Sequence, residues 1–136
     1  MELRLRNYRA EQEGPTVFRY AIRPHQRFAA EDAARFGVAC SQPLIAIPAS
    51  GPTPEKPRLA LSSDKVVVTA FKPSDDGKAW IIRLFGASGQ PQRVKLAWTK
   101  PAPQQLWLSD TSEKPREKTG PAIEVPAWGI VTLRAE

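Results

Sequence analysis

Short runs of alternating apolar and polar residues occupy the second half of the chain, and this alternation is typical of β-strands with one buried face. In the run 92–98, for example, Val94, Leu96 and Trp98 share one face, with Arg93 and Lys95 on the other. The strands predicted in this part are Leu59–Leu61, Val66–Lys72, Trp80–Phe85, Gln92–Trp98, Gln104–Leu108, Ile123–Val125 and Ile130–Arg134. Asp76-Gly77 predicts a tight hairpin between the second and third of these strands. A polar stretch, Ser109–Gly120, separates the fifth and sixth of these strands, and no strand is predicted within it.

The first half of the chain gives weaker and more varied patterns. Two alternating runs predict strands over Glu2–Tyr8 and Thr16–Ile22, the second with its aromatic and aliphatic side chains on one face. The Ala-rich run Ala29–Phe36 predicts a short helix, with acidic residues in its first turn and Gly37 placed to end it. Pro43–Pro57 holds five prolines and predicts an extended loop.

These elements predict a mostly β fold, an antiparallel β-sandwich with one short helix. The strands start at positions 66, 80, 92 and 104, a spacing near that of sandwiches and barrels. Strands do not alternate with helices, which argues against a parallel sheet. Fourteen prolines in 136 residues argue against a helical bundle. We therefore expect residues 1–136 to form a single sandwich domain, with Pro43–Pro57 as a proline-rich loop.

The net charge of +6 raises the question of a nucleic acid or membrane partner. Residues 1–68 and residues 69–136 each contain ten Lys and Arg against seven Asp and Glu, so positive charge is not concentrated in either half. This distribution favours a mixed-charge surface, and we expect neither nucleic acid nor a membrane as partner. No run has the length of a membrane span, and the N-terminal residues lack a signal-peptide pattern, so the chain is compatible with the cytoplasm.

Residues suited to catalysis are few. His25 and Cys40 are the only histidine and cysteine, so the chain contains no zinc-binding pattern and no internal disulfide. It also lacks the glycine-rich motifs of nucleotide-binding proteins, so we expect no cofactor in this chain. His25 directly follows Pro24, where a histidine usually has a structural role. Paired carboxylates occur at Glu31-Asp32 and Asp75-Asp76, which fit a helix N-terminus and a hairpin turn. The sequence therefore favours a binding, structural or accessory module without catalytic residues of its own.

Four tryptophans are the remaining candidates for function. Trp80 and Trp98 share strand faces with aliphatic residues, which favours a place in the core. Trp107 and Trp128 are the better candidates for exposed contacts. Arg83 alternates with apolar residues on a face that should be partly buried, and would then need a carboxylate or carbonyl partner. The candidate contacts to carbohydrate or to another domain are Trp107, Trp128, His25 and Arg83.

The order of several motifs resembles the C-terminal β-domain of family 38 glycoside hydrolases, the retaining α-mannosidases. The segments that carry the resemblance are Phe18–His25, Ser41–Leu44, Lys65–Lys72, Ile81–Gly89 and Pro126–Arg134. They follow one another in the family's order over nearly the whole chain. The chain departs from the family pattern at Thr16, where the family often has histidine, and at Gly129, where it has glutamate.

The resemblance implies that the catalytic nucleophile and a zinc-type metal ion lie in N-terminal catalytic domains of a longer protein, so none of the family's catalytic residues maps onto this chain. It also implies that these catalytic domains are the partner of the chain. On this reading the chain is a non-catalytic accessory domain that packs on them and helps to shape the carbohydrate cleft. The alternative is a free-standing carbohydrate-binding β-sandwich module.

Overall fold

The computed structural model describes residues 14–42, 44–46, 48, 50–52 and 56–136. The strand predicted over Glu2–Tyr8 lies outside them. Within the described part, the chain forms one helix followed by eight strands. These elements are α1 (Ala30–Ser41), β1 (Leu59–Leu61), β2 (Val66–Pro73), β3 (Trp80–Gly86), β4 (Gln92–Trp98), β5 (Leu106–Ser109), β6 (Glu117–Thr119), β7 (Ala122–Val125) and β8 (Ile130–Ala135).

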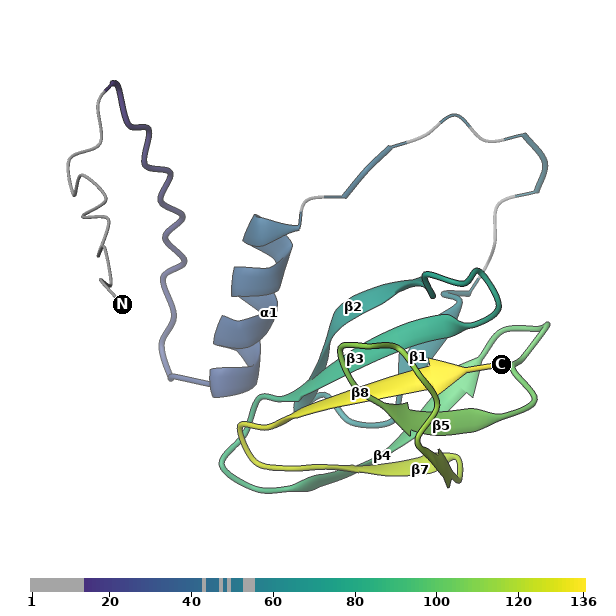
Figure 1. Ribbon diagram of the computed structural model, residues 1–136. Helices are drawn as coiled ribbons and strands as arrows, with labels where there is room; N and C mark the ends of the chain where they lie inside the picture. Colours follow the sequence, from purple (N-terminus) through teal and green to yellow (C-terminus); the bar gives the residue numbers. More distant parts are fainter. Residues whose placement is uncertain (1–13, 43, 47, 49, 53–55) are drawn as a thin grey trace, which may run out of the picture.

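The strands form two antiparallel sheets, consistent with a β-sandwich (Figure 1). The larger sheet has five strands in the order β2-β3-β8-β5-β6, and the smaller sheet has three in the order β1-β4-β7. Strand β8 lies in the middle of the larger sheet and pairs with β3 on one side and β5 on the other. The predicted fold class, mostly β with one short helix, is confirmed.

The core lies between the two sheets and is built from one face of each strand. Across the larger sheet, Phe71, Ile82, Leu133 and Leu108 are directly opposite one another on neighbouring strands, so their side chains share a face. The buried residues of the core cluster are Val66, Ile82, Leu84, Val94, Ile123, Val125, Leu133 and Ala135. Trp80 and Trp98 pack against this cluster, as predicted, and both contact the ring of Phe71.

The predicted strands from Leu59 onward are all present, with small shifts at their ends. The Asp76-Gly77 hairpin joins β2 to β3, and Gly77 has the left-handed φ of +69° that favours glycine. Within the polar stretch Ser109–Gly120, where the sequence predicts no strand, the structure has β6. Residues Glu117–Thr119 are polar but pair with β5 at the sheet edge, where one side of the strand can face water.

Helix α1 extends past the predicted end. Gly37 lies within the helix, and the last turn is closed by a hydrogen bond from the Gln42 N–H to the Val38 carbonyl. The helix can continue because the residues after Gly37 all tolerate helical backbone, and the next residue that cannot is Pro43. The side chain of Gln42 also donates to the Thr69 carbonyl at 3.2 Å, which connects the end of the helix to β2.

The prediction of a strand over Thr16–Ile22 is wrong for this structure. The segment runs as an extended chain beyond α1, separate from the sandwich (Figure 1), and pairs with no described strand. Phe18, Tyr20 and Ile22 remain 72%, 85% and 91% exposed. The alternating pattern is present, but the segment pairs with none of the described edge strands of the sandwich.

The described residues of the Pro43–Pro57 segment form neither helix nor strand. Leu44 and Ile45 in this segment are exposed. Across the described part of the chain, no helix is both long and apolar enough to cross a membrane.

Candidate functional site

The most elaborate polar arrangement surrounds Arg134 at the end of β8. Because Leu133 and Ala135 point into the core, the side chain of Arg134 projects from the outer face of the larger sheet. On that face it lies opposite Ile81 of β3 and Trp107 of β5. The side chain is only 6% exposed, so its charge requires partners.

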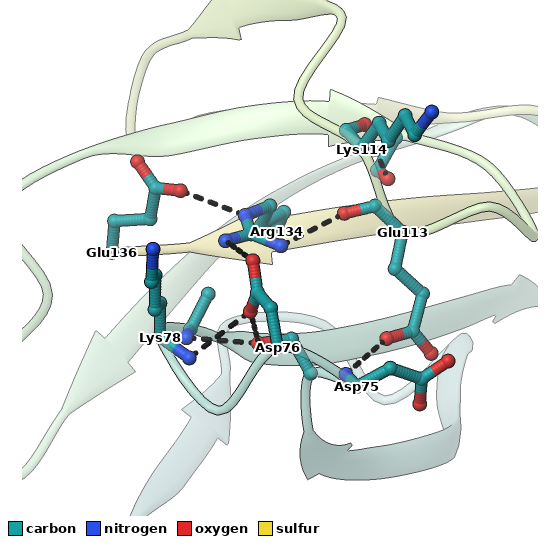
Figure 2. Close-up of polar contacts among 10 residues, drawn as sticks. Asp75, Asp76, Lys78, Glu113, Lys114, Arg134 and Glu136 are labelled. Atoms are coloured by element: carbon teal, nitrogen blue, oxygen red, sulfur yellow. Dashed lines mark hydrogen bonds and ion pairs between the residues drawn. The ribbon is translucent and has the colours of Figure 1, made fainter.

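Three parts of the chain supply those partners (Figure 2). The Nη2 atom of Arg134 donates to the Asp76 carboxylate at 2.8 Å, and Nε donates to the Glu136 carboxylate at 2.7 Å. Nη1 donates to the backbone carbonyl of Glu113 at 3.0 Å. Each guanidinium nitrogen therefore has a partner, and the β2–β3 hairpin, the β5–β6 loop and the end of β8 are joined at one point.

Asp76 is fixed from several directions. Its Oδ1 atom accepts hydrogen bonds from the Ser74 hydroxyl at 2.6 Å and from the Lys78 N–H at 3.0 Å. The hydrogen bond from Ser74, followed by that from Arg134, holds the pKa of the Asp76 carboxyl well below its usual range. Asp76 therefore stays ionised at neutral pH and cannot serve as a general acid there.

Glu113 contributes its carboxylate as well as its carbonyl group. The side chain is 9% exposed and accepts hydrogen bonds from the Asp75 N–H at 2.8 Å and from the Lys72 ammonium group. The contact with Glu113 is the largest cause that raises the pKa of Lys72. Glu113 has a φ of +60°, a conformation that costs a non-glycine residue free energy and that the surrounding contacts hold in place.

This cluster has the geometry of a structural clasp. Its carboxylates are engaged by cations, hydroxyls and backbone N–H groups of the same chain, which leaves no acid and base pair facing an open cleft. Sequence reasoning identified Asp75-Asp76 as turn residues and missed Arg134 and Glu113. The available signal was a single cation in the mostly apolar run 130–135. Asp76 lies 58 residues away, however, and no local pattern identifies it as the partner.

Trp107 and Arg83 both lie on the outer face of the larger sheet. Trp107 alternates with core residues Leu106 and Leu108, is half-buried, and has an indole N–H that is buried without a hydrogen-bond partner among the described residues. Arg83 is half-buried, and its Nε donates to the Thr132 hydroxyl at 3.5 Å. Neither a carboxylate nor a carbonyl partner of Arg83 is found in the described part of the chain.

Trp128 lies in the turn between β7 and β8 and is 56% exposed. Its backbone has a φ of +54°, and its N–H donates to the Gly86 carbonyl at 3.0 Å. Gly86 in turn donates to the Gly129 carbonyl at 2.9 Å. A Cβ at Gly86 would lie 2.2 Å from the Pro126 carbonyl oxygen, so this close approach needs glycine. The turn therefore holds an exposed indole on a rigid support.

His25 is exposed and lies outside the sandwich. Its ring meets Phe28 edge-on, with 6.1 Å between centroids. The two residues line a shallow hollow of about 290 Å³ at the start of α1, together with Phe36. The four predicted contact residues are thus not brought to one site: Arg83 and Trp107 share a sheet face, Trp128 lies in the β7–β8 turn, and His25 precedes the helix.

No group of three or more His, Cys, Asp or Glu side chains among the described residues is arranged to hold a metal ion. The described residues therefore offer no ligand set for a zinc-type ion, which the family resemblance assigns to the catalytic domains.

Comparison with known families gives one match. The model of the glycosyl hydrolases family 38 C-terminal beta sandwich domain matches residues 65–133, which span β2 to most of β8 and make up half of the chain. The motifs at Phe18–His25 and Ser41–Leu44 lie before the matched region. No curated protein and no solved structure matches the chain. On the strength of the family match, the chain belongs to the family of glycosyl hydrolase family 38 C-terminal β-sandwich domains.

Proposed function

We propose that this chain is a non-catalytic accessory domain of an α-mannosidase-like glycoside hydrolase and that it packs on the catalytic domains of the same protein. The observation that carries the proposal is the family match over residues 65–133. The Arg134 cluster supports it, because the carboxylates of this cluster hold the fold together and are not free to act on a sugar. Catalysis, and the zinc-type ion that serves it, would belong to the other domains.

The outer face of the larger sheet is the surface we propose for this packing. Phe85 and Ile130 lie opposite each other there, and Ile130 is 63% exposed. Arg83, whose Nε donates to the Thr132 hydroxyl, is directly opposite Thr132 on the same face. An apolar surface beside a half-buried cation suits a neighbour that supplies apolar side chains and a carboxylate.

The test compares the 136-residue chain with the complete glycosidase that carries it, using an aryl α-mannoside as substrate. We expect turnover by the complete enzyme, and none by the chain alone with or without added Zn²⁺. Replacement of Arg83 by Ala or Ile130 by Asp in the complete enzyme should lower its thermal stability, while the same changes should leave the melting temperature of the isolated chain nearly unaltered. Turnover by the isolated chain would refute the proposal.

Trp128 supports a second candidate function, a carbohydrate-binding module. Its indole is exposed and its backbone is held by the contacts with Gly86, so a sugar ring could stack on it at little entropic cost. Titration of the isolated chain with mannose oligosaccharides, followed by tryptophan fluorescence, separates the two functions. Binding that is lost in Trp128→Ala but kept in Trp107→Ala would favour the module, and an unchanged spectrum would favour the accessory domain.

A further inference from the structure

The segment Thr16–Ile22, here called the arm, has the side-chain arrangement of a strand without a sheet. The rings of Phe18 and Tyr20 lie on one side, stacked with 6.5 Å between their centroids. Arg19 occupies the position between them, and Val17 and Ile22 are 78% and 91% exposed. Exposure of Val17, Phe18, Tyr20 and Ile22 within one short segment is costly in water, so a surface that covered them would stabilise the arm.

The sheet edges of this chain do not suit the arm. Strands β1, β6 and β7 lie at edges but contain only three, three and four residues. Edge strand β2 is longer, with eight residues, but a register shift between Val68 and Ala70 interrupts it and Pro73 ends it without a donor N–H. The side chain of Gln42 also occupies the Thr69 carbonyl. A second copy of the chain therefore offers no regular edge of the arm's length among the described strands.

We propose that the arm adds as an edge strand to a β-sheet in a neighbouring domain of the same glycosidase. This inference rests on the proposed function, because it takes the partner to be another domain of that enzyme. Backbone N–H and C=O groups of the arm would complete the ladder of the partner sheet. Phe18, Tyr20 and Ile22 would cover an apolar face of that sheet, and Arg19 and Arg23 would point to the opposite face, where carboxylates or water would accept their charge.

The arrangement explains why the alternating pattern predicts a strand that the sandwich does not contain. The arm is connected to the sandwich through α1, which lies beside β2. Strand addition would therefore attach the sandwich to the neighbouring domain by backbone hydrogen bonds of the arm as well as by side-chain contacts. Two independent attachments would follow: the arm, and the outer face of the larger sheet.

Hydrogen exchange of the arm amides provides the test, measured residue by residue in the complete glycosidase and in the 136-residue chain. We expect the amides of residues 16–22 to exchange at least about tenfold more slowly in the complete enzyme, with alternate amides protected, since an edge strand donates from every second residue. Equal exchange rates in the two proteins would overturn the proposal. Protection of these amides already present in the 136-residue chain would also overturn the proposal. Protection that rises with protein concentration would then indicate pairing with a second copy of the chain, and protection independent of concentration would indicate pairing within one chain.

Paired variants of the complete enzyme test the role of the apolar side chains. Phe18→Asp with Ile22→Asp should abolish the protection of the arm, whereas Leu44→Asp with Ile45→Asp, a matched change at exposed apolar residues outside the arm, should preserve it. If the first variant does not fold, the milder pair Phe18→Ser with Ile22→Ser should reduce the protection by at least about tenfold. Retained protection in these arm variants would contradict the proposal.

Mannosidase assays on the same preparations separate this inference from the proposed function. Activity in the complete enzyme with an unprotected arm would refute strand addition and leave the accessory role intact. A protected arm in a complete protein that hydrolyses no α-mannoside would refute the proposed function and, with it, a glycosidase as the partner.

Discussion

The part of the chain from Leu59 onward and the part before it differ in how far their apolar side chains are buried. Among the described residues, every buried apolar residue lies between Val66 and Ala135, and α1 has no buried residue at all. In the part of the chain that the structure describes, nine large apolar residues are exposed, and seven of them lie between Val17 and Ile45. The sandwich therefore provides its own hydrophobic core, whereas the arm and the segments on either side of α1 carry apolar surface that suits a partner.

Replacement of one isoleucine in each region gives the largest expected contrast. Ile82 is fully buried, and Ile82→Ala should lower the free energy of unfolding by about 4 kcal/mol through lost burial and the cavity left behind. Ile22 is 91% exposed, so Ile22→Ala should leave that free energy nearly unchanged. Urea unfolding of the 136-residue chain measures both values. A cost above about 1 kcal/mol for Ile22→Ala would show that the arm is part of the core.

Glycine-to-alanine changes give the next contrast, with opposite signs in the two regions. Gly86→Ala should lower stability by about 3 kcal/mol, because the new Cβ would lie 2.2 Å from the Pro126 carbonyl oxygen and disrupt the turn that holds Trp128. Gly37→Ala places a Cβ in open space inside α1 and should stabilise the helix by up to about 1 kcal/mol. Thermal melts and far-ultraviolet dichroism check both. A neutral Gly86→Ala would contradict the close approach at the turn.

Removal of the central cation of the clasp should have a smaller effect. Arg134→Ala should cost about 2 kcal/mol, because it leaves the Glu113 carbonyl and two carboxylates without their partner, although Asp76 is exposed enough to recover water. Arg116→Ala is the matched control. It breaks the exposed ion pair with Asp110 and should cost less than about 1 kcal/mol. Equal costs for the two variants in urea unfolding would mean that the clasp adds nothing beyond a surface pair.

Acidification should produce the smallest effect. The pKa of Asp76 is lower in the folded chain than in the unfolded chain, so the unfolded state binds more protons as pH falls. The contribution of the Asp76 carboxylate to the free energy of unfolding is therefore fully present above about pH 4 and declines progressively as the pH falls below that value. Asp76→Asn should flatten this decline in melting temperature between about pH 4 and pH 2. Part of the decline should remain, because hydrogen bonds from Ser112 hold the pKa of Asp110 below its usual range as well.

The sandwich could be predicted from sequence wherever a strand has a buried face. In the run Gln92–Trp98, Val94, Leu96 and Trp98 face the core while Arg93 and Lys95 are exposed, and the Asp76-Gly77 turn supplies a local signal for the hairpin. Strand β6 was missed because an edge strand of three polar residues has no buried face to mark it. Gly37 suggested an early helix end because glycine is a common terminator, but no constraint in the fold required the helix to stop there.

The clasp shows why the site was harder to predict than the fold. Arg134 and Asp76 meet only because β3 and β8 are neighbours in the sheet, a pairing that spans most of the matched region. The alternation of apolar and polar residues within a strand indicates which face is buried. It does not indicate which turn, distant in the sequence, lies beside the end of that strand. Each of the four predicted contact residues was selected for its own chemistry, and the structure places them in three parts of the fold. Arg83 and Trp107 share a sheet face, Trp128 lies in the β7–β8 turn, and His25 precedes the helix.

The place of β8 has a consequence for synthesis of the chain on the ribosome. It lies later in the sequence than every other described strand, yet it separates β3 from β5 in the larger sheet. Until residue 135 has left the exit tunnel, the β2–β3 hairpin and the β5–β6 pair have no strand between them and expose edges that invite aggregation. A nascent chain arrested before Ile130 should therefore be a strong substrate for chaperones, and release of the last strand should make it independent of them.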